Sequence, residues 1–319
     1  MPEVKRFVGV DVAQKTLRVA EHGASATEEI GNSLRAISSW LGRLEGRCLI
    51  GMESTGTYHQ QLARLAISAG HVVYVLNPRD IKHYGKALGR RAKTDHVDAL
   101  LIARYLAQEH AGLHPWKMPG EAQEAIRGAL NRRHTLVVMR EQMRSCFAGM
   151  GQSLKELPPT LAQLDRLIAE IDAQLKQACA SDPRLVALRD RLRTVPGIGP
   201  LTSIALANLL SRFGFRHADA LIAYVGLDPQ ARDSGEHRGR RHLSKRGPAE
   251  LRRLLFNAAM SASQTEAWQD HYRRLRDRGL KSTEAFVALA RKMLRIVFSM
   301  ARYGTRFDTV RLNGPCQVP

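Results

Sequence analysis

The 319-residue sequence has few cysteines and no long apolar run. Its four cysteines lie too far apart for the ligand spacing of a zinc site or for a disulfide framework, so we expect reduced, structural thiols. They are Cys48, Cys146, Cys179 and Cys316. No stretch approaches the roughly 18 apolar residues of a membrane span, and the first residues, MPEVKRFVGVDVA, carry charges where a signal peptide would be apolar. These absences predict a cytoplasmic protein with no membrane partner.

Acidic residues are also scarce. Thirty Asp and Glu stand against 49 Lys and Arg, which leaves a formal net charge of +19 at pH 7 with histidines neutral. Such an excess favours a polyanionic partner, either nucleic acid or an acidic membrane surface. Because no membrane-spanning or signal-like segment is present, we expect nucleic acid.

Hydrophobic patterns in residues 1 to about 110 predict a mixed α/β layer. Strand-like segments alternate with helical ones, and Gly70 and Pro78 end two of the segments. The expected strands are RFVGVDVA, TLRVAEHG, RCLIGMES and HVVYVLNP, and the expected helices are SLRAISSWLGRL, TYHQQLARLAISAG and the segment that carries Asp95 and Asp98.

The remainder of the chain follows a linker-like segment, HAGLHPWKMPG, and has helical periodicity. Apolar residues spaced alternately by four and three positions give a period of 3.5, which predicts a coiled-coil seam of about three heptads. These residues are Leu157, Leu161, Leu164, Ile168, Ile171, Leu175 and Ala178. The alternative is a long helix packed on its own domain. From about Leu185 onward we expect a compact helical domain.

Four acidic residues stand at positions that suggest a shared site. Asp95 and Asp98 are three apart on a predicted helix and therefore neighbours on one face, although they could also serve as an acidic first turn capped by Thr94. Asp11 lies inside an apolar strand, and Glu53 ends another. If these strands are adjacent and parallel, the carboxylates converge, and divalent cations would offset their repulsion. Mg²⁺ suits a carboxylate cluster without histidines.

Basic residues close to these acids would contact phosphates or belong to a solvated surface. They are Lys82, Lys86, Arg90, Arg91 and Lys93. An ATP-binding sugar-kinase or actin-like core opens with a similar strand and Asp and is a competing interpretation. No glycine-rich phosphate loop follows Glu53, and the net charge does not suit a metabolic kinase.

The second half contains two further candidates for nucleic-acid contact. Gly197 and Gly199, in the PGIG stretch, would let backbone amides approach a phosphate in a helix-hairpin-helix motif, or would simply form a helix-helix turn. A basic stretch follows, with Arg238, Arg240, Arg241, Lys245 and Arg246. Within it Ser234 precedes Gly235, and spacing alone favours a turn over a nucleophile. Ser244 would be an equal candidate.

Six motifs in order give the chain its resemblance to a known family. They are GVDVAQK around Asp11, MESTGTY around Glu53, KTDHVDA, PGIG, GLDPQARDSG and LSKRG. Over nearly its whole length the chain resembles the DEDD transposases of bacterial insertion sequences, the "IS-one-ten" family of bridge-RNA-guided recombinases, and the related Piv-type DNA invertases.

The resemblance implies an RNase H-like, RuvC-type DEDD catalytic domain at residues 1–112. It also implies a linker with coiled-coil dimerisation helices at residues 113–184 and an all-α transposase domain with the helix-hairpin-helix motif at residues 185–319. Asp11, Glu53, Asp95 and Asp98 would bind Mg²⁺, which Mn²⁺ could replace. Ser234 would be the nucleophile that links covalently to a DNA phosphate.

The implied partners are double-stranded donor and target DNA, a structured non-coding bridge RNA, and further copies of the chain. A homodimer would assemble to a tetramer on DNA, in the bacterial cytoplasm near the nucleoid. Two other functions remain open at this point. One is a RuvC-like endonuclease or resolvase whose acids activate water, and the other is a basic nucleic-acid-binding protein whose acids are structural.

Overall fold

A computed structural model of the chain describes residues 6–54, 57–89, 95–148, 155–230 and 242–309, with only the backbone described at 95–97. The chain divides into two compact units, Met1–Met118 and Pro119–Pro319, called unit 1 and unit 2 below. The boundary falls in the segment that the sequence predicts to be a linker.

Unit 1 is built on a five-stranded sheet of order β3-β2-β1-β4-β5. Strand β1 pairs antiparallel with β2 and parallel with β4, and β4 pairs parallel with β5. The strands are β1 (Arg6–Val12), β2 (Thr16–Glu21), β3 (Glu28–Gly31), β4 (Cys48–Glu53) and β5 (Val72–Leu76), and the helices are α1 (Leu34–Leu41), α2 (His59–Ser68), α3 (Pro78–Ala87) and α4 (Asp95–Glu109). The predicted mixed α/β arrangement is confirmed, with β3 and α3 added.

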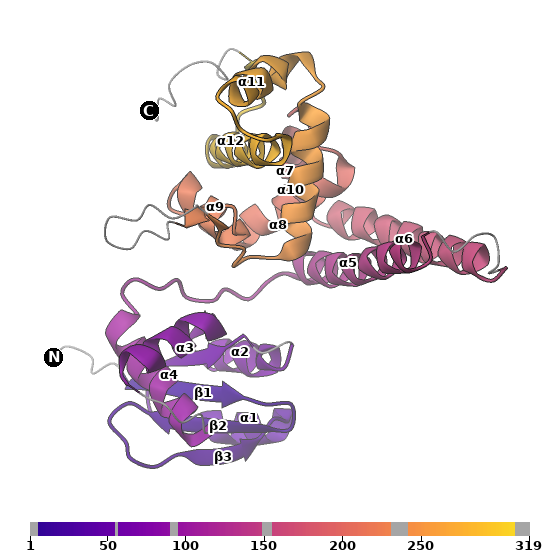
Figure 1. Ribbon diagram of the computed structural model, residues 1–319. Helices are drawn as coiled ribbons and strands as arrows, with labels where there is room; N and C mark the ends of the chain where they lie inside the picture. The colour runs from indigo at the N-terminus through magenta and orange to yellow at the C-terminus, as the bar shows by residue number, and fades with distance from the viewer. Residues whose placement is uncertain (1–5, 55–56, 90–94, 149–154, 231–241, 310–319) are drawn as a thin grey trace. The chain divides into compact units, whose positions relative to one another are not determined.

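The two faces of this sheet are covered by different helices because side chains alternate along each strand. Val8 and Val10 lie in a buried cluster with residues of α1 and α2. Leu49, Tyr74 and Leu76 lie in a second cluster with residues of α3 and α4. Figure 1 shows α4 crossing the sheet. Helices therefore cover both faces of the sheet at β1, β4 and β5, whereas Glu28 and Glu29 on the edge strand β3 are exposed.

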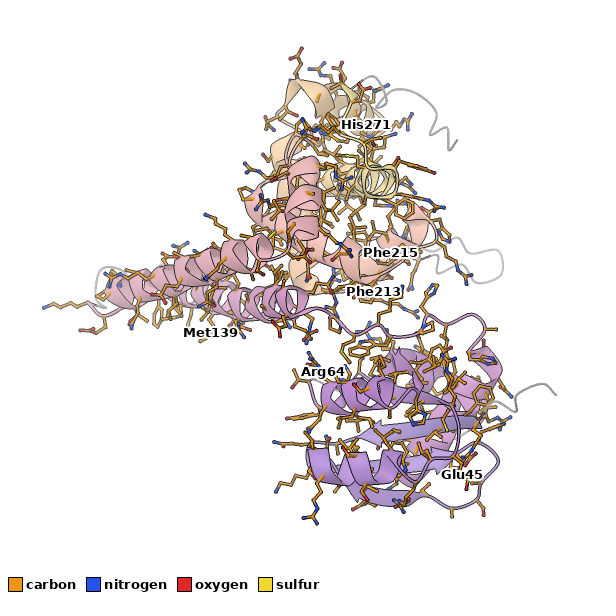
Figure 2. All side chains as sticks on the ribbon, turned by 180° about the vertical axis from the view of Figure 1, so that it is seen from behind. Glu45, Arg64, Met139, Phe213, Phe215 and His271 are labelled. Carbon is orange, nitrogen blue, oxygen red and sulfur yellow. The ribbon has the colours of Figure 1, made fainter. Side chains whose placement is uncertain are left out.

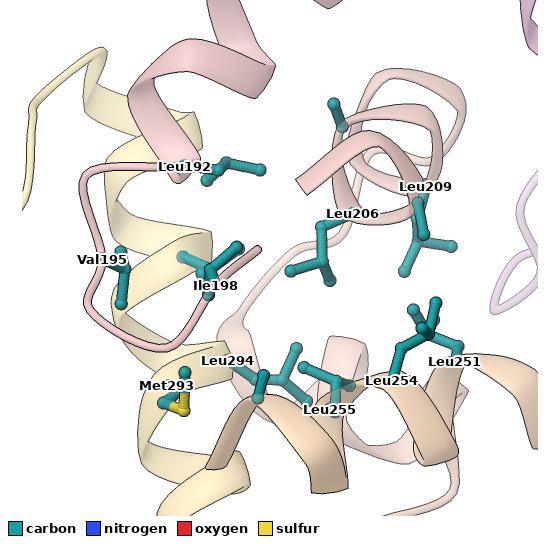
Figure 3. Close-up of a cluster of buried hydrophobic side chains, with 14 of the residues drawn as sticks. Leu192, Val195, Ile198, Leu206, Leu209, Leu251, Leu254, Leu255, Met293 and Leu294 are labelled. Carbon is teal, nitrogen blue, oxygen red and sulfur yellow. The ribbon is translucent and has the colours of Figure 1, made fainter. Parts of the chain in front are cut away.

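Unit 2 is helical apart from a two-stranded ribbon. Its helices are α5 (Glu121–Cys146), α6 (Leu157–Ala180), α7 (Pro183–Leu192), α8 (Pro200–Arg212), α9 (Ala218–Val225), α10 (Ala249–Ala262), α11 (Glu266–Asp277) and α12 (Ser282–Tyr303), and its short strands are β6 (Pro229–Gln230) and β7 (His242–Leu243). Leu206, Leu255 and Leu294, from three of these helices, meet in one buried core (Figure 3). This confirms the expected helical second half.

The predicted coiled-coil seam lies on the buried side of α6. Ile168 and Leu175 are buried, and the other seam residues are partly buried. Helix α5 packs antiparallel against α6, with ion pairs from Arg133 to Asp172 at 2.6 Å and from Arg140 to Asp165 at 2.7 Å. The 3.5-residue period therefore has an explanation within one chain, and a coiled coil between chains stays a prediction.

None of the described helices is both long and apolar enough to cross a membrane.

Candidate active site

Asp11 and Glu53 end adjacent parallel strands. The parallel register of β1 and β4 pairs Val10 with Met52, so Asp11 and Glu53 occupy the next position along each strand. Asp11 alternates with Val10 and Val12 and lies on the opposite face from their buried cluster. A charge inside an apolar strand is tolerated here because it faces away from that cluster and is only partly buried.

A glycine two residues before each acid lets α4 approach the sheet. A Cβ at Gly9 would stand 2.2 Å from the Ala99 carbonyl oxygen, and a Cβ at Gly51 would stand 3.2 Å from the Ile102 side chain. Side chains two apart on a strand share a face. Asp11 and Glu53 therefore lie on the face that α4 covers, just beyond the helix contact. The pattern Gly-x-acid occurs in both strands, and the sequence reasoning missed its meaning.

Helix α4 runs antiparallel to β1. The rings of Phe7, near the start of β1, and His110, just after α4, are 4.9 Å apart, so the C-terminal end of α4 lies over the start of the strand. The N-terminal end of α4 consequently lies toward Asp11. Asp11 lies two residues past Gly9, about 7 Å along the strand. Gly9 lies against α4 between Ala99 and Ala103, so Asp98 precedes this contact by about three residues, or about 4.5 Å along the helix.

Asp98 continues the helix row that contacts β4. It precedes Ile102 by four residues, one turn, and Ile102 lies over Gly51. Asp98 is partly buried. Asp11, Glu53 and Asp98 therefore come from three elements to the same end of the same sheet face, as the parallel-strand argument predicts. Asp95 is the first residue of α4, and its side chain lies outside the described residues.

The donor set suits a divalent metal, but the described side chains do not complete a site. All three acids offer the hard oxygen ligands that Mg²⁺ prefers. Within the described part of the chain, no group of three Asp, Glu, His or Cys gathers closely enough to hold a metal ion. Since Asp95 is not among those side chains, the four-carboxylate site stays a prediction.

The predicted basic contacts on α3 are exposed. Lys82 and Lys86 are one turn apart and exposed, while Ile81 and Gly85 on the same helix are buried. A Cβ at Gly85 would meet Leu101 of α4 at 2.9 Å, so α3 packs on α4 and leaves both lysines to solvent. Arg90, Arg91 and Lys93 lie outside the described residues. The exposed lysines fit either phosphate contacts or a solvated face.

The motifs GLDPQARDSG and LSKRG form the two legs of one hairpin. Strand β6 pairs antiparallel with β7, Ser244 donates its backbone N–H to the Asp228 carbonyl at 3.0 Å, and Lys245 donates to the Gly226 carbonyl at 3.1 Å. The Ser244 hydroxyl donates to the Asp228 carboxylate. Ser244, considered above as a nucleophile, therefore ties the legs together. The segment between the legs, with Ser234, Arg238, Arg240 and Arg241, lies outside the described residues.

Glycine is required where these two legs cross. Gly226 has φ +76°, and a Cβ at Gly247 would stand 1.9 Å from the Tyr224 carbonyl oxygen. Lys245 also has a positive φ, 51°, which is rare for a side chain that is not glycine. Lys245 and Arg246 are exposed beside this crossing. The crossing of Gly226 and Gly247 is thus held by backbone contacts that tolerate little change.

The PGIG turn joins α7 to α8, and its glycines have different surroundings. Gly197 has φ +91°, and a Cβ there would stand 2.5 Å from the Ala258 carbonyl oxygen of α10. Gly199 is the N-cap of α8 and has open space around it. Gly197 thus has a packing role, and Gly199 is the glycine that a phosphate could approach. The helix-hairpin-helix assignment stays a prediction.

Two family profiles match separate parts of the chain. A transposase profile designated DEDD_Tnp_IS110 covers residues 8–147, which include Asp11, Glu53, Asp95 and Asp98. A profile described as "Transposase IS116/IS110/IS902 family" covers residues 189–273, which include the PGIG turn and the hairpin.

Curated relatives align over most of the chain. The pilin gene-inverting protein of Moraxella bovis is 32% identical over 267 residues, which cover 81% of this chain and 81% of the relative. The probable family 20 transposase of Pseudomonas aeruginosa is 27% identical over 92% of this chain and 96% of its own. The transposase for insertion sequence element IS1328 of Yersinia enterocolitica is 27% identical over 97% and 100%. The chain therefore belongs to the IS116/IS110/IS902 transposase family with a DEDD domain, and it is an enzyme of DNA recombination and transposition.

Proposed function

We propose that this chain excises and inserts an insertion-sequence element by cutting and rejoining DNA strands through a covalent phosphoserine intermediate. The observation that carries the proposal is the convergence of Asp11, Glu53 and Asp98 at one end of the sheet face under α4. Family membership removes the kinase-like and non-enzymatic alternatives.

Unit 1 would be the RNase H-like, RuvC-type domain, with Asp95 as the fourth carboxylate. If a shared metal held these acids about 4 Å apart, each pair of charges would repel by roughly 4 kcal/mol at an effective dielectric near 20. The positive end of the α4 dipole offsets part of this repulsion. A bound divalent ion, Mg²⁺ with Mn²⁺ able to replace it, would offset the rest and stabilise charge on a transferring phosphoryl group.

Ser234 would supply the nucleophile from the hairpin of unit 2. Its Oγ would form a bond to a DNA phosphorus while the P–O bond to the departing sugar breaks, and the reverse step would free the serine. Each step exchanges one phosphate ester for another, so bond energy is conserved. Activation of a serine hydroxyl needs a base or electrostatic help, which the carboxylate site would provide. The contacts between β6 and β7 support this role because they fix the base of the loop.

Ser234→Ala tests the mechanism. We expect it to abolish covalent protein–DNA adducts, trapped by denaturation during strand exchange, while melting temperature and DNA binding stay unchanged. Ser244→Ala is the matched control, because Ser244 has a structural partner in Asp228, and it should retain adducts. Adducts that persist in Ser234→Ala and are lost in Ser244→Ala would reassign the nucleophile.

The second candidate function is hydrolytic cleavage by a RuvC-like endonuclease or resolvase. The carboxylates alone favour it, since such a site can also activate water. It predicts free DNA ends and no protein-linked DNA in the same trapping assay, with Ser234→Ala still active.

The proposal includes a structured non-coding RNA that pairs with donor and target DNA, and assembly through a homodimer to a tetramer. The exposed Val138 and Met139 of α5 and Leu167 of α6 support self-association through these two helices. Met139 is labelled in Figure 2. Light scattering of Met139→Glu should show a smaller species than the native chain. Sequencing of RNA that copurifies with the native chain should recover a segment from the flank of its own coding region.

A further inference from the structure

A cavity of about 250 Å³ lies inside unit 2. It is lined by residues of α5, α8, α9 and α10, and these include Arg127, Asn208, Arg212, Phe213, Tyr224 and Glu250. Its volume is below the roughly 300–1,000 Å³ of sites for drug-sized ligands. The cavity would therefore hold a group no larger than one nucleotide.

The cavity wall carries an excess of positive charge. Arg127 pairs with Glu124 at 2.7 Å, and Arg212 approaches the same carboxylate at 3.9 Å, so two guanidiniums share Glu124. Burial lowers the pKa of Arg212, Glu124 partly offsets this, and Arg127 adds to it by repulsion. Glu250, the acid among the lining residues, accepts two hydrogen bonds from Arg253 and lies 3.0 Å from His134. An anion that entered would relieve the repulsion between Arg127 and Arg212.

Two buried polar atoms of lining residues lack hydrogen-bond partners. Among the described residues nothing bonds to the Oδ1 atom of Asn208, which is 5% exposed, or to the Nε atom of Arg127. A buried polar group without a partner costs about 1–3 kcal/mol. A ligand that offers both a donor and an acceptor would remove these costs.

One wall of the cavity is aromatic. Phe213, Phe215 and Tyr224 form a cluster with ring centroids 4.9–5.9 Å apart, and the two phenylalanines are labelled side by side in Figure 2. The Arg212 guanidinium lies 5.3 Å from the centre of the Phe213 ring. Aromatic faces and arginine planes are surfaces on which nucleobases stack.

We propose that this cavity binds one unpaired nucleotide of the bound DNA, with its phosphate at Arg127 and Arg212, its base toward Phe213 and Tyr224, and a polar edge at Asn208. A paired base could not enter a cavity walled by four helices, so the nucleotide must leave the stack. The inference depends on the family's action on DNA and is independent of the proposed serine chemistry.

Photocrosslinking of the full chain locates the nucleotide. A duplex with one unpaired 5-iododeoxyuridine is irradiated with the protein in EDTA, so that no metal-dependent step takes part. Mass spectrometry should place the adduct on Phe213 or Tyr224, and a fully paired duplex should give at least tenfold less of it. Adducts scattered over other residues, or equal yields from both duplexes, would overturn the proposal. So would a higher yield from an RNA strand with 5-iodouridine.

Binding of thymidine monophosphate to variants tests the polar contacts. Asn208→Leu and Arg212→Gln should each weaken binding roughly tenfold to a hundredfold, the range for a hydrogen bond to a charged group, whereas the exposed Arg184→Gln should not. Thymidine and inorganic phosphate, each tested alone, should bind more weakly. If Arg212→Gln lowers the melting temperature, the monophosphate binding of Asn208→Leu alone tests the proposal.

Free nucleotide and strand nucleotide are distinguished by comparing the two assays. Crosslinking that depends on Asn208 without measurable monophosphate binding would support a site for strands only. Native binding of both probes by Asn208→Leu would show that the cavity is not the site.

Discussion

Units 1 and 2 arrange their carboxylates in different ways. In unit 1, the partly buried Asp11, Glu53 and Asp98 lie toward one end of the same sheet face. In unit 2, Glu250 pairs with the cations Arg253 at 2.7 Å and Arg133 at 3.7 Å, and the His134 ring lies 3.0 Å away. The comparison teaches that the first arrangement costs stability and serves chemistry, whereas the second satisfies a buried charge and serves the fold.

The largest expected effect is on activity, from a change in unit 1. Glu53→Gln removes one negative charge from the gathered acids and keeps the size of the side chain. We expect strand exchange to fall at least roughly a hundredfold, as for the loss of a metal-ligating group. Stability should be unchanged or slightly higher because repulsion decreases. A recombination assay with a melting curve measures both, and a large loss of stability would contradict a functional role.

The counterpart in unit 2 is Glu250→Gln, which leaves Arg253 without its carboxylate, while Arg133 keeps its ion pair with Asp172. Since Glu250 is 7% exposed and its cations are partly solvated, we expect a loss of about 2–3 kcal/mol in the free energy of unfolding. Pulse proteolysis with peptide mapping would locate the loss in unit 2. If Glu53→Gln destabilises as much as Glu250→Gln, the comparison fails.

A smaller effect on stability is expected in the PGIG turn, where the two glycines should respond differently to substitution. Gly197→Ala places a Cβ at φ +91° against the backbone of α10, and we expect it to cost about 1–3 kcal/mol. Gly199→Ala has open space and should cost less than about 1 kcal/mol. Urea unfolding measures the free energy of both. DNA binding that weakens in Gly199→Ala at unchanged stability would support a phosphate contact there.

The smallest expected effect is the loss of stability of unit 1 at acidic pH. Burial lowers the pKa of His71 in unit 1, and its Nδ1 accepts the Cys48 backbone N–H at 3.2 Å, which requires a neutral ring. Below the unfolded pKa of about 6.5 the unfolded chain binds the extra proton, so the stability of unit 1 should fall as pH decreases. His71→Gln should flatten that dependence, as followed by pulse proteolysis between pH 7 and 5. An unchanged slope would assign the acid sensitivity to other groups.

Sequence reasoning succeeded where periodicity is strong. The alternating strand around Asp11 and the apolar strand before Glu53 predict two buried strands, and both are confirmed. Their parallel pairing, which the argument for converging carboxylates needed as a condition, is observed. Strand β3 was missed because Glu28–Gly31 is too short to show alternation, and α3 because Pro78–Ala87 contains few apolar residues.

The cavity residues had no sequence signal. Arg127 is one of several arginines on α5. Arg212 and Asn208 are two of the polar residues on the mostly apolar α8. Arg127 and Asn208 are 81 positions apart in the sequence and come together only because α5 packs on α8. A pattern within one segment cannot predict such a contact.

The sequence by itself determined that unit 1 is a mixed sheet with acids at strand ends, that the second half is helical, and that the partner is a polyanion. Strand period, helix period and net charge are local or additive properties, so each can be determined from the sequence. Only the tertiary structure decided that α4 reaches the sheet over Gly9 and Gly51, and that two arginines, from α5 and α8, share one carboxylate beside a cavity. These depend on close packing between segments far apart in the chain.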